Sequence, residues 1–93
     1  MSHPVLVPGA VAVVTGGAAG IGLAAAKAFA RLGLNVAIAD IGPERLARAA
    51  EEIAADAPDG AASVMACECD VSRVEDLKRL ESEVLGRFGS IDV

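Results

Sequence analysis

The 93-residue sequence predicts an α/β fold built on a parallel sheet, and three observations lead to this class. Short apolar runs alternate with longer segments whose apolar residues recur every three or four positions, giving the order βαβαβα and the beginning of a fourth strand. The apolar runs are almost uninterrupted, which is typical of strands buried on both faces of a sheet. Glycine or proline stands at most boundaries. We therefore expect a doubly wound sheet with the spatial strand order 3-2-1-4 and helices on both faces.

The first strand and helix are predicted by a change of period. Residues 10–15 (AVAVVT) form a valine-rich run that is directly followed by two glycines. The helix that follows should cover residues 21–32 and end before Gly33, a suitable C-terminal cap. Its apolar side would carry Ile21, Ala25, Ala28, Phe29 and Leu32.

The second strand and helix are bounded by polar and helix-starting residues. Residues 35–39 (NVAIA) predict a buried strand that ends at Asp40. Pro43 suits the first position of the next helix, which must stop by Pro58. Its apolar side should carry Leu46, Ala50, Ile53 and Ala57.

The last third of the chain predicts one more strand and helix. Residues 63–69 read as a strand diluted by Ala, Glu and Cys. Ser72 with Glu75 three positions later predicts a capping box, and Gly89 should close the helix. Residues 91–93 would begin the fourth strand, beside the first one, so we expect the sequence to be the first part of a larger fold.

The composition of the chain limits the kinds of partner that we expect it to bind. Acidic residues outnumber basic ones by 13 to 8, and the net charge of −5 has the wrong sign for a surface that binds nucleic acid phosphates. No stretch approaches the roughly 18 apolar residues of a membrane span. Cys67 and Cys69 are too few for a disulfide framework and lack the second Cys pair of a zinc site, so we expect small buried thiols. We therefore predict a cytoplasmic protein with no metal.

The strongest local signal is the glycine-rich turn between the first strand and the first helix, TGGAAGIG at residues 15–22. A diphosphate needs backbone N–H donors with no side chain in the way, and a helix N-terminus supplies the donors and a positive dipole end. Gly16 would permit the tight turn and Gly20 the approach of phosphates, while Gly22, with Ala25 and Ala26, would let the helix pack closely on the sheet.

Asp40, at the end of the second strand, lies close to the offset expected of the acid that binds the adenosine ribose. A 2′-phosphate would repel this carboxylate, so NAD should be preferred over NADP. Arg45 is the nearest cation, and we expect the second helix to present it to solvent.

These motifs together resemble the short-chain dehydrogenase/reductase family. The resemblance rests on the TGxxxGxG spacing of residues 15–22, on Asp40, on the Cys69-Asp70-Val71 segment, and on the FGSIDV ending at residues 88–93. It implies a Rossmann-type doubly wound sheet, of which residues 1–93 would be the N-terminal dinucleotide-binding part of a single larger domain. It also implies a parent enzyme that transfers hydride between NAD and an alcohol or carbonyl substrate, as a homo-oligomer, either dimer or tetramer.

The resemblance further implies a role for each matching residue. In the family the turn contacts the phosphates and adenosine, the acid holds the ribose, and the residues after the third strand bind adenine; Asp70 has a second reading as a helix-capping acid. The cofactor-binding residues implied are Gly16, Ala18, Ala19, Gly20, Ile21, Gly22, Asp40, Ile41, Asp70 and Val71.

The catalytic residues of the family are not matched in this sequence. The family's catalytic Ser and YxxxK pair come later in its pattern, and these 93 residues contain no Tyr, so alone they should be inactive. A non-catalytic NAD-binding module is the main alternative, and a fragment that completes its sheet on a partner is another. A methyltransferase would also have glycines after the first strand, but in a GxGxG-type turn.

Overall fold

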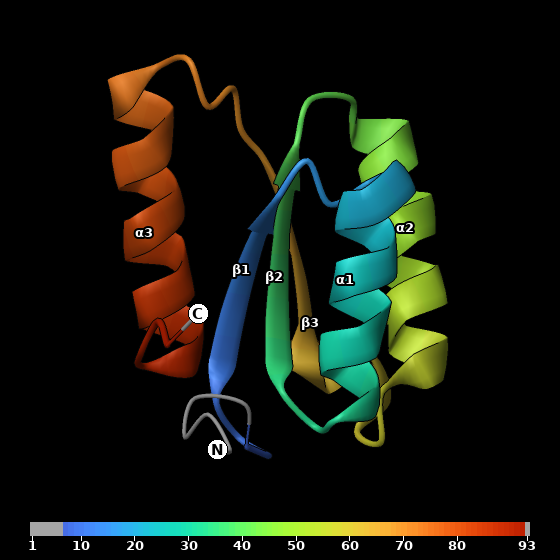
Figure 1. Cartoon of the computed structure of the whole chain (residues 1–93). Coiled ribbons are helices and arrows are strands. Elements are labelled where there is room, and N and C mark those ends of the chain that lie inside the picture. The colour runs from blue at the N-terminus through green and yellow to red at the C-terminus, as the bar shows by residue number, and fades with distance from the viewer. Residues whose placement is uncertain (1–6, 93) are drawn as a thin grey trace.

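The computed structural model describes residues 7–92. Strands and helices alternate along the chain, which confirms the predicted βαβαβα order (Figure 1). The elements are β1 (Val11–Thr15), α1 (Gly20–Arg31), β2 (Asn35–Asp40), α2 (Pro43–Asp56), a 3₁₀ turn η1 (Gly60–Ser63), β3 (Val64–Glu68) and α3 (Val74–Phe88).

The three strands form a parallel sheet in the order β1-β2-β3. The central strand β2 is buried on both sides, with Val36 and Ile38 turned to one face and Ala37 and Ala39 to the other. This double burial is why the strand reads as a continuous apolar run rather than an alternating one. Because all three strands are parallel, their carboxyl ends lie together at one edge of the sheet.

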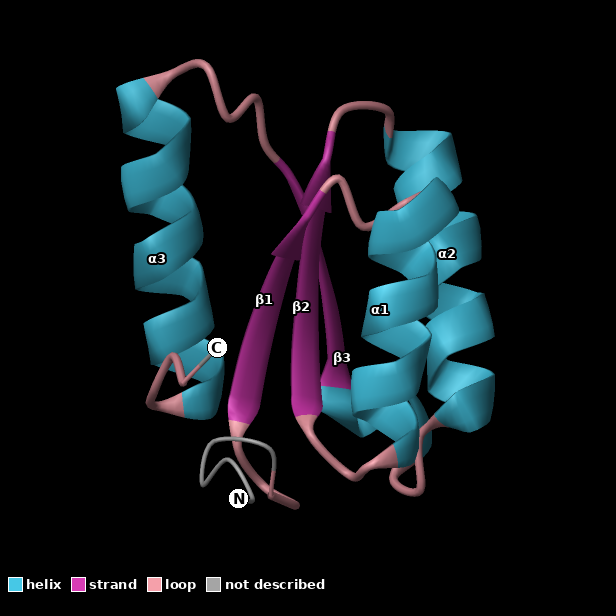
Figure 2. Cartoon of the chain, in the orientation of Figure 1, coloured by secondary structure: helices cyan, strands magenta, loops and turns pink. Residues whose placement is uncertain are grey.

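Helices cover both faces of the sheet, as the sequence predicts. Figure 2 shows α1 and α2 side by side on one face and α3 on the other. Beneath α1 and α2 lies a large apolar core that includes Leu34, Ile38 and Ile53, and α3 covers a smaller core through Leu80 and Val84. No helix formed by residues 7–92 has the length and apolar character needed to cross a membrane.

The expected apolar side of α1 is partly wrong. Ile21 is 90% exposed and Leu32 is half exposed, whereas the residues buried against the sheet are Ala26 and Ala30. Alanine lets the helix backbone lie close to the strands, so the smallest side chains occupy the contact and the larger ones lie around it.

The predicted capping box at the start of α3 is also wrong. The residue at the N-cap position is Arg73, with no side-chain cap, and the Ser72 hydroxyl instead donates to Asp70 Oδ1 at 2.6 Å. The helix does end at Gly89, which adopts the left-handed conformation with φ = 84° as expected.

The beginning of a fourth strand is not formed by Ile91 and Asp92, and residue 93 lies outside the described part. Asp92 nevertheless lies against β1, because its N–H donates to the Val11 carbonyl at 2.8 Å and its Oδ2 accepts the Val11 N–H at 2.9 Å. The chain after α3 therefore returns to the edge of β1, where the predicted strand order would place it.

Candidate functional site

The turn after β1 is shaped by two glycines in the left-handed region. Gly16 has φ = 69° and Gly20 has φ = 58°, conformations that side chains strongly disfavour. A Cβ atom built on either glycine would meet nothing within 4 Å. The backbone of the turn is therefore open to a ligand on the side of these two residues, which is the kind of cradle that a diphosphate requires.

Two further glycines lie where the turn contacts the rest of the protein, and neither position has room for a side chain. A Cβ atom on Gly17 would lie 2.6 Å from Cγ2 of Ile38, and one on Gly22 would lie 2.8 Å from the carbonyl carbon of Gly16 and closer still to its oxygen. Gly22 thus allows α1 to pack on the turn itself, whereas the close packing on the sheet that we expected of Gly22, Ala25 and Ala26 is made by Ala26. Gly17 is not among the residues that the sequence predicts for the site, and its requirement for glycine follows from the Ile38 side chain that occupies the space of a Cβ atom.

The first turn of α1 presents unpaired backbone donors. Its N-cap residue is Ala19, and the first bond into the helix runs from the Leu23 N–H to the Ala19 carbonyl at 3.3 Å. The N–H groups of Gly20, Ile21 and Gly22 therefore precede the helical bonding pattern. Together with the positive end of the helix dipole, they form a site suited to an anion beside the open glycines.

Asp40 is directed toward this turn. Its Oδ2 accepts the Ala18 N–H at 3.2 Å, and its Oδ1 accepts the Ile41 N–H at 2.8 Å. The N–H groups of Gly16 and Gly17 donate to the Ala39 carbonyl at 2.7 and 3.4 Å, so three hydrogen bonds join the turn to the end of β2. A carboxylate has about four acceptor positions, and two of them stay available for ligand hydroxyls.

Arg45 is exposed, as the sequence predicts, but its side chain also bends back toward the end of β2. Its Nη2 donates to the Ile41 carbonyl at 3.0 Å and lies 3.8 Å from Asp40 Oδ1, although the side chain is 55% exposed. The guanidinium thereby adds a positive charge beside the carboxylate, which no spacing rule in the sequence could have indicated.

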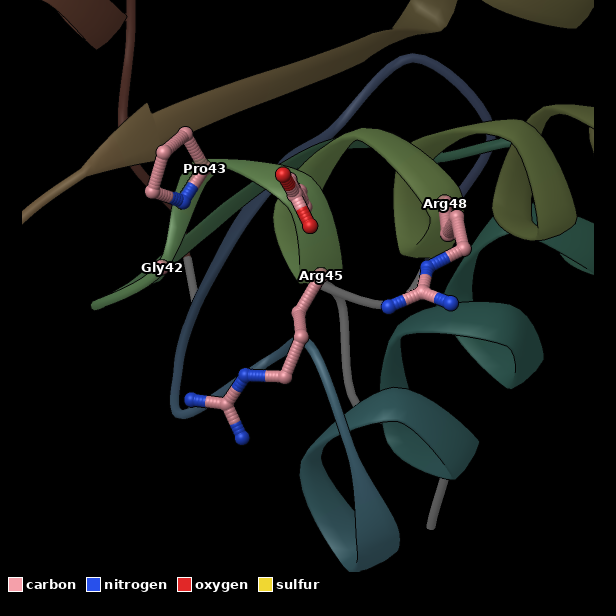
Figure 3. Close-up of a pocket in the computed structure, with 5 residues that line it drawn as sticks. Gly42, Pro43, Arg45 and Arg48 are labelled. Atoms are coloured by element: carbon pink, nitrogen blue, oxygen red, sulfur yellow. The ribbon is translucent and has the colours of Figure 1, made fainter.

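A surface pocket adjoins this ion pair at the N-terminal end of α2. Figure 3 shows Arg45 and Arg48 extending from the helix, with Gly42 and Pro43 at its start. The lining residues are Gly42, Pro43, Glu44, Arg45 and Arg48. Two basic side chains and one acidic side chain therefore border the pocket.

The segment after β3 lies next to the end of β2, because the Cys69 N–H donates to the Asp40 carbonyl at 2.9 Å. Asp70 Oδ1 accepts both the N–H and the hydroxyl of Ser72, and these bonds hold the pKa of Asp70 below its usual value. Val71 and Ile41 are about half exposed, and each follows one of the two adjacent strand ends.

Cys67 and Cys69 are free, buried thiols, as predicted. Burial, followed by a hydrogen bond from the thiol of Cys67 to Glu83 at 3.1 Å, raises the pKa of Cys67 to about 12. A thiol that stays protonated at neutral pH is a poor nucleophile, so this residue packs between β3 and α3 rather than taking part in chemistry.

Comparison with known proteins gives these features a family context. The family model of the short chain dehydrogenases matches residues 10–93. The chain is 39% identical over 85 residues to the short chain dehydrogenase/reductase dpmpG of Macrophomina phaseolina, covering 91% of this chain and 47% of that protein.

Comparison with solved structures indicates the same family. The NADP complex of the C-domain of a bacterial malonyl-CoA reductase superimposes with a TM-score of 0.86 at 34% identity, over 92% of this chain and 14% of that one. A short chain dehydrogenase/reductase from Burkholderia phymatum in complex with NAD gives 0.81 at 34% identity, over 90% and 28%. The chain thus spans less than half of the length of these relatives. Its βαβαβα arrangement is the Rossmann-type fold, and the chain belongs to the short-chain dehydrogenase family.

Proposed function

We propose that this chain is the cofactor-binding part of an NAD-dependent oxidoreductase, which transfers hydride between the nicotinamide and an alcohol or carbonyl substrate. The observation that carries the proposal is the bond between the Ala18 N–H and Asp40 Oδ2 at 3.2 Å. It brings a carboxylate suited to ribose hydroxyls into direct contact with a turn suited to a diphosphate.

The diphosphate would lie against the open side of the glycine turn. Gly16 and Gly20 leave room for it, and the N–H groups of Gly20, Ile21 and Gly22 are the donors in reach of its oxygens. Neither alanine of the turn fills this cradle, because the side chain of Ala18 is buried in the larger core and Ala19 carries only a methyl group. The chain therefore offers a binding surface made almost entirely of backbone.

The adenosine would extend toward the ends of β2 and β3. The two free acceptor positions of Asp40 would take the ribose hydroxyls, and the half-exposed Ile41 and Val71 would border the adenine ring. Asp70 would accept from the adenine amino group through the oxygen that Ser72 does not use. A 2′-phosphate about 4 Å from Asp40 would be repelled by roughly 4 kcal/mol at an effective dielectric near 20, which favours NAD.

Residues 1–93 would then be the N-terminal part of one larger Rossmann-type domain, in line with the limited share of each relative that they match. The nicotinamide supplies the hydride chemistry when it is bound, and the Ser, Tyr and Lys of the family pattern would come from the remainder of that domain. A reading frame that continues past residue 93 into a YxxxK segment would support this arrangement, whereas a stop codon would favour a non-catalytic NAD-binding module. The cytoplasmic location and the homo-oligomer stay predictions.

The proposed binding site is tested by calorimetric titration of the intact protein with NAD and with NADP. We expect NAD to bind more tightly, and Asp40→Asn to reduce that preference at least tenfold, because a neutral amide no longer repels the 2′-phosphate. Asp59→Asn, which removes the same charge from the loop after α2, should leave the preference as it is. Absence of binding to either dinucleotide would refute the proposal.

A further inference from the structure

Arg45 is held beside the acid on which cofactor choice depends. Its Nη2 donates to the Ile41 carbonyl at 3.0 Å, and its Nε would be 3.4 Å from a Cβ atom on Gly42, so the side chain folds back over Gly42 toward the end of β2. The hydrogen bond to the Ile41 carbonyl holds the guanidinium beside Asp40 in a long ion pair, with 3.8 Å between Nη2 and Oδ1.

The contact leaves the guanidinium with unused donors. Arginine has five N–H donors, and the Ile41 carbonyl occupies one of them. Guanidinium donors match phosphate oxygens in geometry and bind them with charge-assisted hydrogen bonds. A phosphate placed beside Asp40 would therefore be repelled by the carboxylate and attracted by the neighbouring guanidinium, so the two charges would act in opposite directions.

The surroundings of Arg45 favour the same kind of ligand. Arg48 borders the adjoining pocket (Figure 3), and the acidic side chain among its lining residues is Glu44. The pocket opens at the N-terminal end of the 14-residue helix α2, where the dipole is positive. The Asp40 carboxylate, which repels a 2′-phosphate, thus lies next to a pocket whose basic residues could attract that phosphate.

We infer that Arg45 is a specificity-determining residue of the cofactor site, which moderates the exclusion exerted by Asp40, so that the protein binds NADP as well as NAD with only a moderate preference for NAD. The inference rests on the proposed function. On this inference, Asp40 and Arg45 together set the choice between the two cofactors. Neutralising Asp40 alone then makes NADP the preferred ligand.

The test measures the dissociation constants of NAD and NADP for the intact protein by calorimetry. Arg45→Ala should raise the ratio of the NADP constant to the NAD constant roughly tenfold, because a phosphate loses its charge-assisted bonds. Arg45→Lys keeps the charge and should stay closer to the wild-type ratio. The matched control is Arg31→Ala, which removes a charge from the exposed Arg31–Asp56 pair. It should leave the ratio within about twofold, because this pair joins the last residues of α1 and α2, at the opposite end of both helices from Asp40 and Arg45.

The double variant separates the role of Arg45 from that of Asp40. Asp40→Asn should bind NADP more tightly than NAD, and Asp40→Asn/Arg45→Ala should lose this reversal. An unchanged ratio in Arg45→Ala, or a reversal that persists in the double variant, overturns the role of Arg45 while leaving the NAD site intact. A wild-type protein that binds neither dinucleotide refutes the proposed function itself, and the role of Arg45 with it.

Discussion

Gly22 and Gly86 make a matched pair that tests how the glycine turn is built. Gly22 is the third residue of α1 and Gly86 is the third residue from the end of α3. An alanine in a helix is more favourable than glycine by up to about 1 kcal/mol, and this gain applies to both positions. A Cβ atom on Gly86 would meet nothing within 4 Å, whereas one on Gly22 would press on the carbonyl group of Gly16.

The magnitude follows from what the new atom meets. The obstacle at Gly22 is backbone, which cannot rotate away, so the helix start and the turn must separate at a cost of about 1–3 kcal/mol. Gly86→Ala should raise the free energy of unfolding by up to about 1 kcal/mol, and Gly22→Ala should lower it by roughly 1–2 kcal/mol. Urea denaturation of the intact protein, followed by circular dichroism, measures both. If the two variants shift stability in the same direction and to the same extent, the close contact between α1 and the turn is not real.

The remaining predictions concern a thiol and a helix end. Because the pKa of Cys67 is raised to about 12, the folded protein should lose stability as the pH rises from about 9 toward 12, and Cys67→Ala should lose less. Labelling of Cys67 by iodoacetamide at pH 8 should be slow in the native protein and fast in urea, and equal rates would contradict its burial. Gly89→Ala should reduce the free energy of unfolding by about 1 kcal/mol despite the open space around Gly89, because φ = 84° disfavours a side chain; a stabilised variant would show that α3 ends differently.

The parts of the fold that the sequence predicts well are those marked by special backbone chemistry. Pro43 begins α2, and both Gly33 and Gly89 lie in the left-handed conformation just beyond a helix, because few other residues can occupy these places. The continuous apolar run of β2 likewise has one natural environment, a strand covered on both faces. Local chemistry is enough to position these elements to within one or two residues.

The errors arise where two local or tertiary interactions compete. Ser72 could cap α3, but Asp70 lies two positions before it and takes its hydroxyl. Ile21 has the right period for the buried side of α1, yet the contact with the sheet favours Ala26 and Ala30. Arg45 comes near Asp40 only because its side chain bends back to the Ile41 carbonyl. None of these outcomes can be predicted from residue spacing, since each depends on which of two possible contacts is the more favourable in the folded protein.

The division of the apolar interior into two cores has a consequence for how the proposed dinucleotide would be released. Ala18, Ile38 and Leu46, which support the glycine turn and the start of α2, belong to the larger core. The Asp70 segment is tied by its N–H to Asp76 on α3, the helix above the smaller core. In the proposed cofactor site, loosening of α3 would therefore release the adenine end of the dinucleotide first, while the diphosphate stayed bound to the turn.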